Sequence, residues 1–321
     1  MKPARDGRFI FFEPWSLGDV IIAAAALREL SEPAALACHP SWHALLRCAL
    51  AEKPDLDLIA IDLPYTRRNR VHPFESGPDA AGLATSEPTT VLSIRGDFRD
   101  LAAAHKLLPK ARVRMNGWLR FFGRKSAIVN FPFAVGLCPV ENRYRSWARL
   151  AGVAYSQIEA TYRRKQAQAA TTNRVAIHIG AQWRSKQYPD VSDLRDALGE
   201  LGVSVRILAG PGDLRPRGVS ENEVTRVADE ALVEELRSAR HVITNDSGPM
   251  HVAAFLGCRT VAVVRTSPIE EWAPPATEIV RSPETPRGYR PDRRYMSDEV
   301  LPGWPSPSSV LEKMRIQLAR H

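Results

Sequence analysis

Short apolar runs alternate with helical segments along nearly the whole chain, and this alternation constrains the fold more than any other feature. In the first half the pattern predicts strands at 9–12, 34–38, 58–62, 90–94 and 111–115 and helices at 18–30, 41–53, 98–108 and 141–151. Strands that alternate with helices pair in parallel through right-handed crossovers. The sequence therefore predicts an α/β fold with doubly wound sheets, whose ligands bind at the carboxyl ends of the strands.

The same pattern starts again after a polar segment at 163–174, which we interpret as an interdomain linker. It predicts strands at 175–179, 205–210, 224–228, 241–245 and 260–264 and helices at 193–202, 232–240, 249–257 and 308–319. Prolines interrupt 64–88 and the chain after 273, where irregular structure is expected. A chain of 321 residues suits two domains of about 150 residues each, which we place at 1–165 and 174–305.

Charge and hydropathy narrow the classes of partner. The net charge of +8 attracts anions, whether nucleic acid, lipid headgroups or a phosphorylated substrate. The apolar run before Glu13 is too short for a signal peptide and no apolar run could span a membrane, so we expect a cytoplasmic protein. The cysteines show no metal-ligand spacing, so no metal site is expected, and Cys38 and Cys258 stand in apolar segments as buried thiols.

The strongest candidate site follows the strand at 241–245. Asp246, Ser247 and Gly248 form a turn, and Pro249 stands at the first helical position, where proline is favoured. First-turn amides and the helix dipole attract anions, so the amides from Ser247 to His251 could cradle a diphosphate. The alternative is an ordinary capped helix in which Asp246 is the cap and His251 is a core residue.

A second candidate follows the strand at 175–179. The chain turns through Gly180 and then presents two basic residues, Arg184 and Lys186. A lysine at the carboxyl end of a strand can meet phosphate oxygens and support a departing nucleotide. The alternative is a solvated lysine on a loop.

A third candidate is Asp19, which follows Gly18 at the start of the long apolar helix after the first strand. An aspartate in the first turn favours the helix dipole, and that alone could explain it. At a ligand crevice the same carboxylate could act as a general base. Neither the G-x-G-x-x-G dinucleotide fingerprint nor the GxxxxGK[ST] phosphate loop is present.

Taken in order, the three motifs resemble those of family 9 glycosyltransferases, the heptosyltransferase family. They read SLGDVIIAAAALREL, GAQWRSKQYP and DSGPMHVAAFLG, and the resemblance covers roughly residues 8–275. Arg265 stands where relatives usually have glycine. The resemblance implies the GT-B architecture, in which two Rossmann-like doubly wound domains face each other across a cleft. It implies that 1–165 binds the acceptor, 174–305 binds the nucleotide-sugar, and the final helix at 306–321 packs back on the first domain.

The resemblance also implies a reaction. It is the inverting, metal-independent transfer of a sugar, heptose in the family, from an ADP-sugar to a hydroxyl of a lipopolysaccharide-core saccharide, without a cofactor. By position, Asp19 would be the general base and Asp246 would contact sugar hydroxyls. The phosphate-binding set would comprise Gly180, Lys186, Ser247, Gly248, Met250 and His251.

The basic residues of the first half suggest where an acceptor docks. Four are candidates for holding a phosphorylated or lipid-linked saccharide, which would bring the protein to the inner face of the cytoplasmic membrane: Arg67, Arg68, Arg120 and Arg124. Two alternatives stay open. One is an epimerase or hydrolase of nucleotide-sugars that uses Glu13 and His178 as acid and base. The other is a basic nucleic-acid-binding protein, although no RNA- or DNA-binding motif accompanies the charge.

Overall fold

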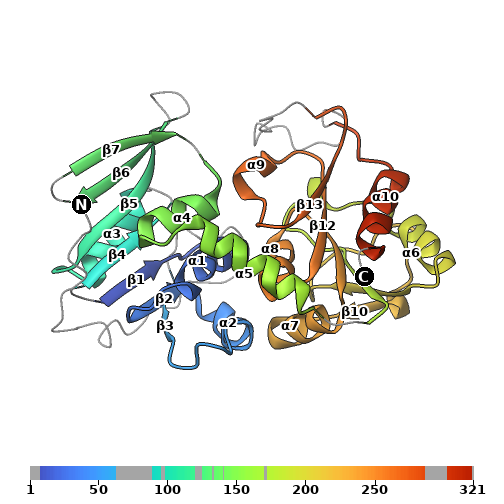
Figure 1. The fold of residues 1–321 in the computed structure, drawn as a ribbon, viewed down its shortest axis with the longest axis horizontal. Coiled ribbons are helices and arrows are strands. Elements are labelled where there is room, and N and C mark those ends of the chain that lie inside the picture. The colour runs from blue at the N-terminus through green and yellow to red at the C-terminus, as the bar shows by residue number, and fades with distance from the viewer. Residues whose placement is uncertain are drawn as a thin grey trace. The chain divides into compact units, whose positions relative to one another are not determined.

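The computed structural model describes residues 8–62, 89–94, 98–119, 125–131, 134–139, 141–169, 172–285 and 302–319. The chain divides into two compact units, Met1–Ile158 and Glu159–His321. Each unit is built on its own β-sheet with helices packed against it (Figure 1). The predicted α/β class is therefore confirmed, and each half of the chain has a sheet of its own. The irregular loop predicted at 64–88 lies outside the described residues.

The sheet of the first unit has the strand order β3-β2-β1-β4-β5-β6-β7. Its strands are β1 Arg8–Phe12, β2 Ala34–Cys38, β3 Asp57–Ala60, β4 Thr89–Ser93, β5 Arg112–Leu119, β6 Lys125–Phe131 and β7 Ala134–Pro139. The first five are parallel and coincide closely with the predicted strands, whereas β6 and β7 extend the sheet in antiparallel fashion. The prediction missed β6 and β7 because no helical segment separates them from β5.

The helices of the first unit bury an unusually apolar surface. They are α1 Leu17–Arg28, η1 Pro40–Trp42, α2 His43–Ala49, α3 Phe98–Leu107 and α4 Arg143–Ala151. α1 is buried on every side because small alanine side chains let it lie close to its neighbours, and it packs against α4. Trp147 of α4 stacks on Phe11 of β1 at 5.2 Å between ring centroids. These contacts hold the start of α1, and with it Asp19, at the carboxyl end of β1.

The sheet of the second unit is entirely parallel. Its strands are β8 Arg174–His178, β9 Ser204–Ala209, β10 Val224–Arg226, β11 His241–Asn245, β12 Arg259–Val264 and β13 Glu278–Arg281. They lie in the order β10-β9-β8-β11-β12-β13, so the chain direction across the sheet reverses between β8 and β11. In doubly wound sheets the ligand crevice lies at the carboxyl ends of the strands at such a switch point.

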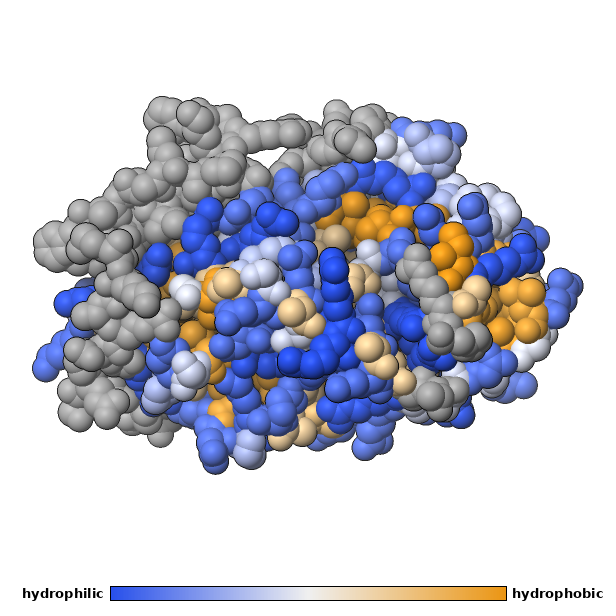
Figure 2. All heavy atoms as spheres, in the orientation of Figure 1, coloured by the Kyte–Doolittle hydropathy of each residue, from blue (hydrophilic) through white to orange (hydrophobic). Residues whose placement is uncertain are grey.

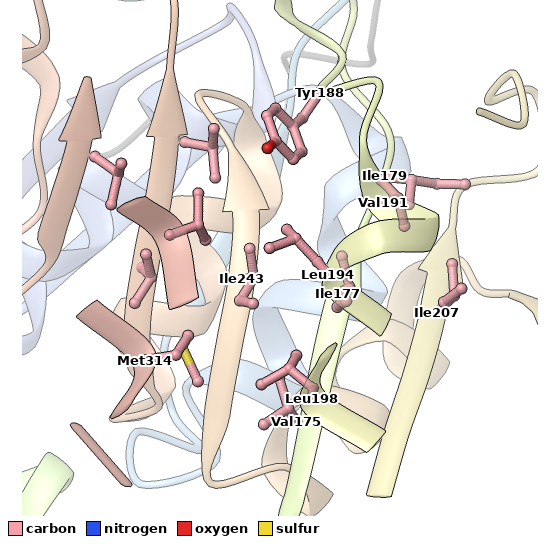
Figure 3. Packing of buried hydrophobic residues seen from close by; sticks show 14 of the residues in the cluster. Val175, Ile177, Ile179, Tyr188, Val191, Leu194, Leu198, Ile207, Ile243 and Met314 are labelled. Carbon is pink, nitrogen blue, oxygen red and sulfur yellow. The ribbon is translucent and has the colours of Figure 1, made fainter. Parts of the chain in front are cut away.

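The helices of the second unit cover both faces of this sheet. They are α6 Val191–Glu200, α7 Asp229–Ser238, α8 Gly248–Leu256, α9 Ile269–Trp272 and α10 Pro307–Leu318, with short 3-10 turns η5 Arg184–Lys186 and η6 Glu221–Glu223. Successive strand residues face opposite sides. Val261 and Val263 therefore join the core under α6 and α10, while Ala262 and Val264 pack with α8. In Figure 3 this core runs from Val175 to Tyr188, which lies beyond the carboxyl ends of the strands.

The C-terminal helix α10 packs on the sheet of the second unit. Its buried residues Val310 and Met314 belong to the core of the second unit, where the helix contacts α6, β12 and β13 (Figure 1). Its apolar face therefore contributes to the core of the second unit, and packing of the final helix on the first domain stays a prediction. Its N-cap is Ser306, whose hydroxyl accepts from the Ser309 amide.

Helix α5 Tyr155–Ala167 corrects the expected linker. It occupies the start of the segment interpreted as a linker, and the division between the units falls inside it. Its second half packs on α8, where the Tyr162 and Phe255 rings meet edge to face. A polar composition misled the prediction because only a narrow stripe of α5 is buried. Strand β13 was also missed, since prolines surround it in the sequence.

The face shown in Figure 2 is mainly polar, and the two cysteines expected to be buried are buried. Polar residues predominate on the face shown in Figure 2, and the apolar areas between them are separate. None of the helices in the described part of the chain is long and apolar enough to cross a membrane. Cys38 and Cys258 are buried, as predicted, and burial raises the pKa of each thiol to about 12.

Candidate functional site

The polar residues of the second unit converge where β8, β11 and β12 end. Lys186 comes from the segment after β8, Asp246 follows β11 directly, and Ser267 lies in the segment after β12. The carboxyl ends of parallel strands meet at one edge of a sheet, and this edge includes the switch point between β8 and β11. The fold therefore brings together three segments that are far apart in the sequence.

Asp246 is the centre of this cluster. Its Oδ2 atom accepts from Lys186 Nζ at 2.6 Å and from the Ser267 hydroxyl. The residue is only 8% exposed, so both contacts lie in a largely desolvated environment. Asp246 is not the helix cap, because the N-cap of α8 is Ser247. Lys186 is likewise no freely solvated lysine, so the structural alternatives for these two residues are wrong.

The charge of Asp246 is set by its partners. Burial by itself raises the pKa of the carboxyl, but the charge and hydrogen bond of Lys186, the Ser267 hydroxyl and nearby His251 together lower it below its usual value. Asp246 is therefore a carboxylate at neutral pH. A buried carboxylate beside a lysine can orient hydroxyl groups of a ligand while the lysine meets anionic oxygens.

Asn245 fixes the segment that carries Lys186. Its Oδ1 accepts from the Tyr188 amide at 3.0 Å, and its Nδ2 donates to the Ile179 carbonyl at 2.8 Å and the Gly180 carbonyl at 3.3 Å. One buried amide thus ties the start and the end of the segment to β11. Lys186 itself lies in the single turn η5, where its amide donates to the Trp183 carbonyl.

Helix α8 begins one residue earlier than predicted, at Gly248, so Pro249 is its second residue. Ser247 is extended, with φ −153° and ψ 174°, and Pro249 lies in the first turn. Residues from Ser247 to Pro249 are half-buried, whereas Met250 and His251 are buried. The Met250 amide donates to the Ser247 carbonyl at 3.1 Å, so it is engaged within the helix turn. The accessible part of this helix start is therefore Ser247 and Gly248.

Gly180 leaves space for a carboxylate behind the Lys186 segment. A Cβ atom at Gly180 would lie 1.7 Å from Oδ2 of Asp213, whose carboxylate also accepts from the Gly210 amide at 2.6 Å. The Gly180 amide donates to Nδ1 of buried His178 at 3.2 Å. Burial lowers the pKa of His178 to about 4, against the opposing charge of Asp213, so His178 is neutral at pH 7.

Asp19 lies at the carboxyl edge of the sheet of the first unit. It is 7% exposed, and its Oδ2 accepts from the Ser16 hydroxyl at 2.6 Å and the Ser16 amide at 3.3 Å. These bonds form a capping box at the start of α1. Glu13, at the end of β1, is 1% exposed. The capping role of Asp19 is thus present, and a role as base would be additional to it.

The part of the chain that carries this cluster matches the model of a known protein family. Residues 151–299 match the model of glycosyltransferase family 9 (heptosyltransferase). The match contains Lys186, Asp246 and Ser267, and with them the whole cluster at the carboxyl edge of the second sheet.

Solved structures share the fold of this chain. A family 9 glycosyl transferase from Veillonella parvula aligns with a TM-score of 0.67 and 16% identity over 98% of each chain. Escherichia coli heptosyltransferase WaaC with ADP-2-deoxy-2-fluoro heptose aligns with a TM-score of 0.57 and 15% identity over 97% of this chain and 99% of that one. For E. coli ADP-heptose lps heptosyltransferase II the values are 0.57 and 16% over 98% and 99%. The chain therefore has the GT-B fold. A sequence search of curated proteins gave no match.

Several residues around this cluster were not singled out from the sequence. Ser267 and Asn245 bond to Asp246 and to the Lys186 segment, and Asp213 lies against Gly180. Their position at the end of a predicted strand or within three residues after it was the available signal. The acceptor candidates Arg67, Arg68, Arg120 and Arg124 lie outside the described residues. Within the described residues, no group of three or more His, Cys, Asp and Glu could hold a metal ion.

Proposed function

We propose that the protein transfers a sugar from a nucleotide-diphosphate donor to a hydroxyl of a saccharide acceptor. The observation that carries this proposal is the Lys186–Asp246–Ser267 cluster beside the start of α8, at the switch point of the second sheet. An anion site next to hydroxyl-orienting groups suits a ligand that joins a diphosphate to a sugar. The donor is an ADP-sugar of the heptose class, a choice supported by the ligands named for the WaaC and ADP-heptose relatives.

The donor site divides into a phosphate part and a sugar part. The diphosphate binds at Gly180, the Lys186 ammonium and the helix start formed by Ser247 and Gly248, with Met250 and His251 completing the first turn. The helix dipole and the lysine charge stabilise the diphosphate as it leaves. Asp246 accepts hydrogen bonds from sugar hydroxyls, because its carboxylate is charged and already oriented by Ser267.

The transfer is a single inverting displacement. The acceptor oxygen forms a bond to the anomeric carbon as the bond from that carbon to the diphosphate oxygen breaks, and Asp19 takes the proton of the acceptor hydroxyl. The negative charge that develops on the departing nucleotide is met by Lys186 and the α8 amides. These residues need no metal ion for that purpose, so we propose metal-independent transfer.

The acceptor is a saccharide of the lipopolysaccharide-core type, phosphorylated or lipid-linked. The basic residues Arg67, Arg68, Arg120 and Arg124 would attract its anionic groups. An acceptor anchored in a membrane would bring the protein to the inner face of the cytoplasmic membrane. The support is the net charge of +8 and the lipopolysaccharide enzyme among its structural relatives.

A ligand panel tests the donor. ADP-, GDP-, UDP- and TDP-linked sugars are compared by the shift that each causes in the unfolding temperature. We expect ADP-sugars to stabilise the protein most, and equally in the presence of EDTA. A preference for another nucleotide would contradict the ADP assignment, and stabilisation by none of them would contradict the donor site. Consumption of the nucleotide-sugar without an acceptor would favour the epimerase or hydrolase alternative.

Substitution of Asp19 tests the base. Asp19→Ala should lower the rate of transfer by about 100-fold or more, with little change in donor affinity. Ser16→Ala is the matched control, because it removes a hydrogen bond to the Asp19 carboxylate and keeps the carboxylate itself. Ser16→Ala should retain most of the transfer rate. An active Asp19→Ala enzyme would refute the assignment of the base.

A further inference from the structure

Arg265, which follows β12, contacts two later parts of the chain, Thr285 and the segment at 302–305. It is 7% exposed, and its Nε donates to the Pro302 carbonyl at 2.5 Å. Its guanidinium carbon lies 5.3 Å from the centroid of the Trp304 ring, within the range of a cation–π contact. Its own carbonyl accepts from the Thr285 hydroxyl at 2.6 Å. A buried arginine with these contacts holds the segment at 302–305 in one position.

Trp304 in turn contacts the segment that carries Lys186. The Trp304 and Tyr188 rings meet edge to face, with centroids 5.5 Å apart and an interplanar angle of 78°. The Tyr188 hydroxyl donates to the Pro305 carbonyl at 3.2 Å, and the Tyr188 amide donates to Asn245. Tyr188 stands two residues after Lys186. The segment is therefore fixed on one side by β11 and on the other by 302–305.

These contacts close into a ring with the ion pair of the site. Ser267 stands two residues after Arg265, and its hydroxyl bonds to Asp246, which accepts from Lys186. The end of β12 thus reaches the Lys186 segment by two routes. One route runs through the polar cluster, and the other through the aromatic contact of Trp304.

We infer that Arg265 and Trp304 are positioning residues that hold Lys186 in its phosphate-binding place. This role rests on the proposed function, because it presumes that Lys186 meets the donor diphosphate. A free lysine side chain samples many rotamers, and its ordering on binding lowers affinity. Fixing the backbone on both sides of Lys186 before the donor arrives reduces that loss. Neither Arg265 nor Trp304 touches the donor in this role.

Hydrogen exchange in the nucleotide-free protein tests the positioning directly. Arg265→Ala and Trp304→Ala should speed exchange of the amides at 182–190 by about tenfold. Arg265→Ala loses the cation–π contact and the hydrogen bond to Pro302, and Trp304→Ala loses the cation–π contact and the ring contact with Tyr188. Met314→Ala is the matched control, because it destabilises the same core from α10. The control should leave exchange at 182–190 unchanged when the variants are compared at equal global stability. Unchanged exchange in the Arg265 and Trp304 variants, or equal acceleration in the control, would overturn the inference.

Titration with ADP separates this inference from the proposed function. Arg265→Ala and Trp304→Ala should weaken ADP binding by about tenfold, whereas Met314→Ala should not. Trp304→Phe and Arg265→Lys should recover part of the affinity, because they keep a ring or a cation at the contact. Wild-type protein that fails to bind ADP would overturn the proposed donor, while exchange at 182–190 would still decide the positioning. If the wild-type protein binds ADP and the Arg265→Ala and Trp304→Ala variants bind it equally well, the positioning inference is overturned and the proposed donor is not.

Discussion

The ion pair of Asp246 and Lys186 contributes to the stability of the folded protein, and both residues belong to the proposed donor site. The Asp246 side chain is 10% exposed and the Lys186 side chain 28%. Removing one partner of such a pair leaves the other desolvated without compensation, which costs more than removing both. Stability and ligand binding can therefore be separated by comparing single and double substitutions.

Lys186→Ala should lower the free energy of unfolding by about 2 kcal/mol, because the buried Asp246 carboxylate loses its hydrogen-bonded cation and keeps the Ser267 hydroxyl. The double variant Lys186→Ala/Asp246→Asn should recover most of that loss, yet its affinity for ADP should stay as low as that of the single variant. Urea unfolding and calorimetric titration with ADP measure the two quantities. A double variant no more stable than the single one would contradict this account of the pair.

His178 makes stability depend on pH. The unfolded chain protonates it near the ordinary pKa of 6.5, whereas burial lowers the pKa in the folded protein to about 4. As pH falls through this window the unfolded state binds a proton that the folded state does not. The stability contributed by neutral His178 is therefore complete above pH 6.5 and is lost toward pH 4, at about 1.4 kcal/mol per pH unit.

We expect His178→Gln to flatten the dependence of unfolding free energy on pH between 6.5 and 4. Urea unfolding at several pH values in that range measures the slope for each protein. Identical slopes would mean that another group is responsible.

At the scale of elements, Gly257 and Gly202 both follow helices in the left-handed conformation but have different surroundings. Gly257, at the end of α8, has φ 93°, and a Cβ atom there would lie 2.7 Å from the carbonyl carbon of Lys165 in α5. Gly202, after α6, has φ 69° with nothing within 4 Å of such an atom. Gly257 therefore serves both the helix end and the close packing of α5 on α8.

Gly257→Ala should cost about 3 kcal/mol of unfolding free energy, from the left-handed backbone and from the displacement of α5. Gly202→Ala, the matched control, should cost about 1 kcal/mol, from the backbone alone. Chemical denaturation of both variants checks the difference. Equal losses would show that α5 moves aside without penalty.

At the scale of the whole molecule, the proposed contacts of the nucleotide lie in the second unit. Residues after β8 and β11 provide them, and Asp19 belongs to the first unit. The two roles can therefore be separated in the intact chain. Binding should protect one set of amides, and loss of the base should leave that protection as it is.

ADP at 100 times its dissociation constant should raise the free energy of unfolding by about 2.7 kcal/mol. Hydrogen exchange should slow at 178–188 and 244–252, and Asp19→Ala should show the same protection. Protection confined to the first unit would contradict the placement of the donor. Loss of protection in Asp19→Ala would contradict the separation of roles.

Much of the fold and part of the site could be predicted from local sequence. The parallel strands β1, β2, β8, β11 and β12 coincide with apolar runs, because a buried parallel strand is apolar along its whole length. The start of α8 was also predictable, since a serine or glycine cap followed by proline is a local signal. Antiparallel β6 and β7 escaped prediction because no helical segment separates them from β5, and helix α5 escaped it because only a narrow stripe of it is buried.

By itself, the sequence determined the order of strands and helices and the residue types that follow each strand. Only the tertiary structure decided which of those residues meet. Lys186 and Asp246 stand 60 positions apart, and Arg265 and Pro302 stand 37 apart. Such pairs form because the sheet order places the ends of β8, β11 and β12 at one edge. Periodicity and capping act over a few residues, whereas these contacts arise from the packing of the complete sheet.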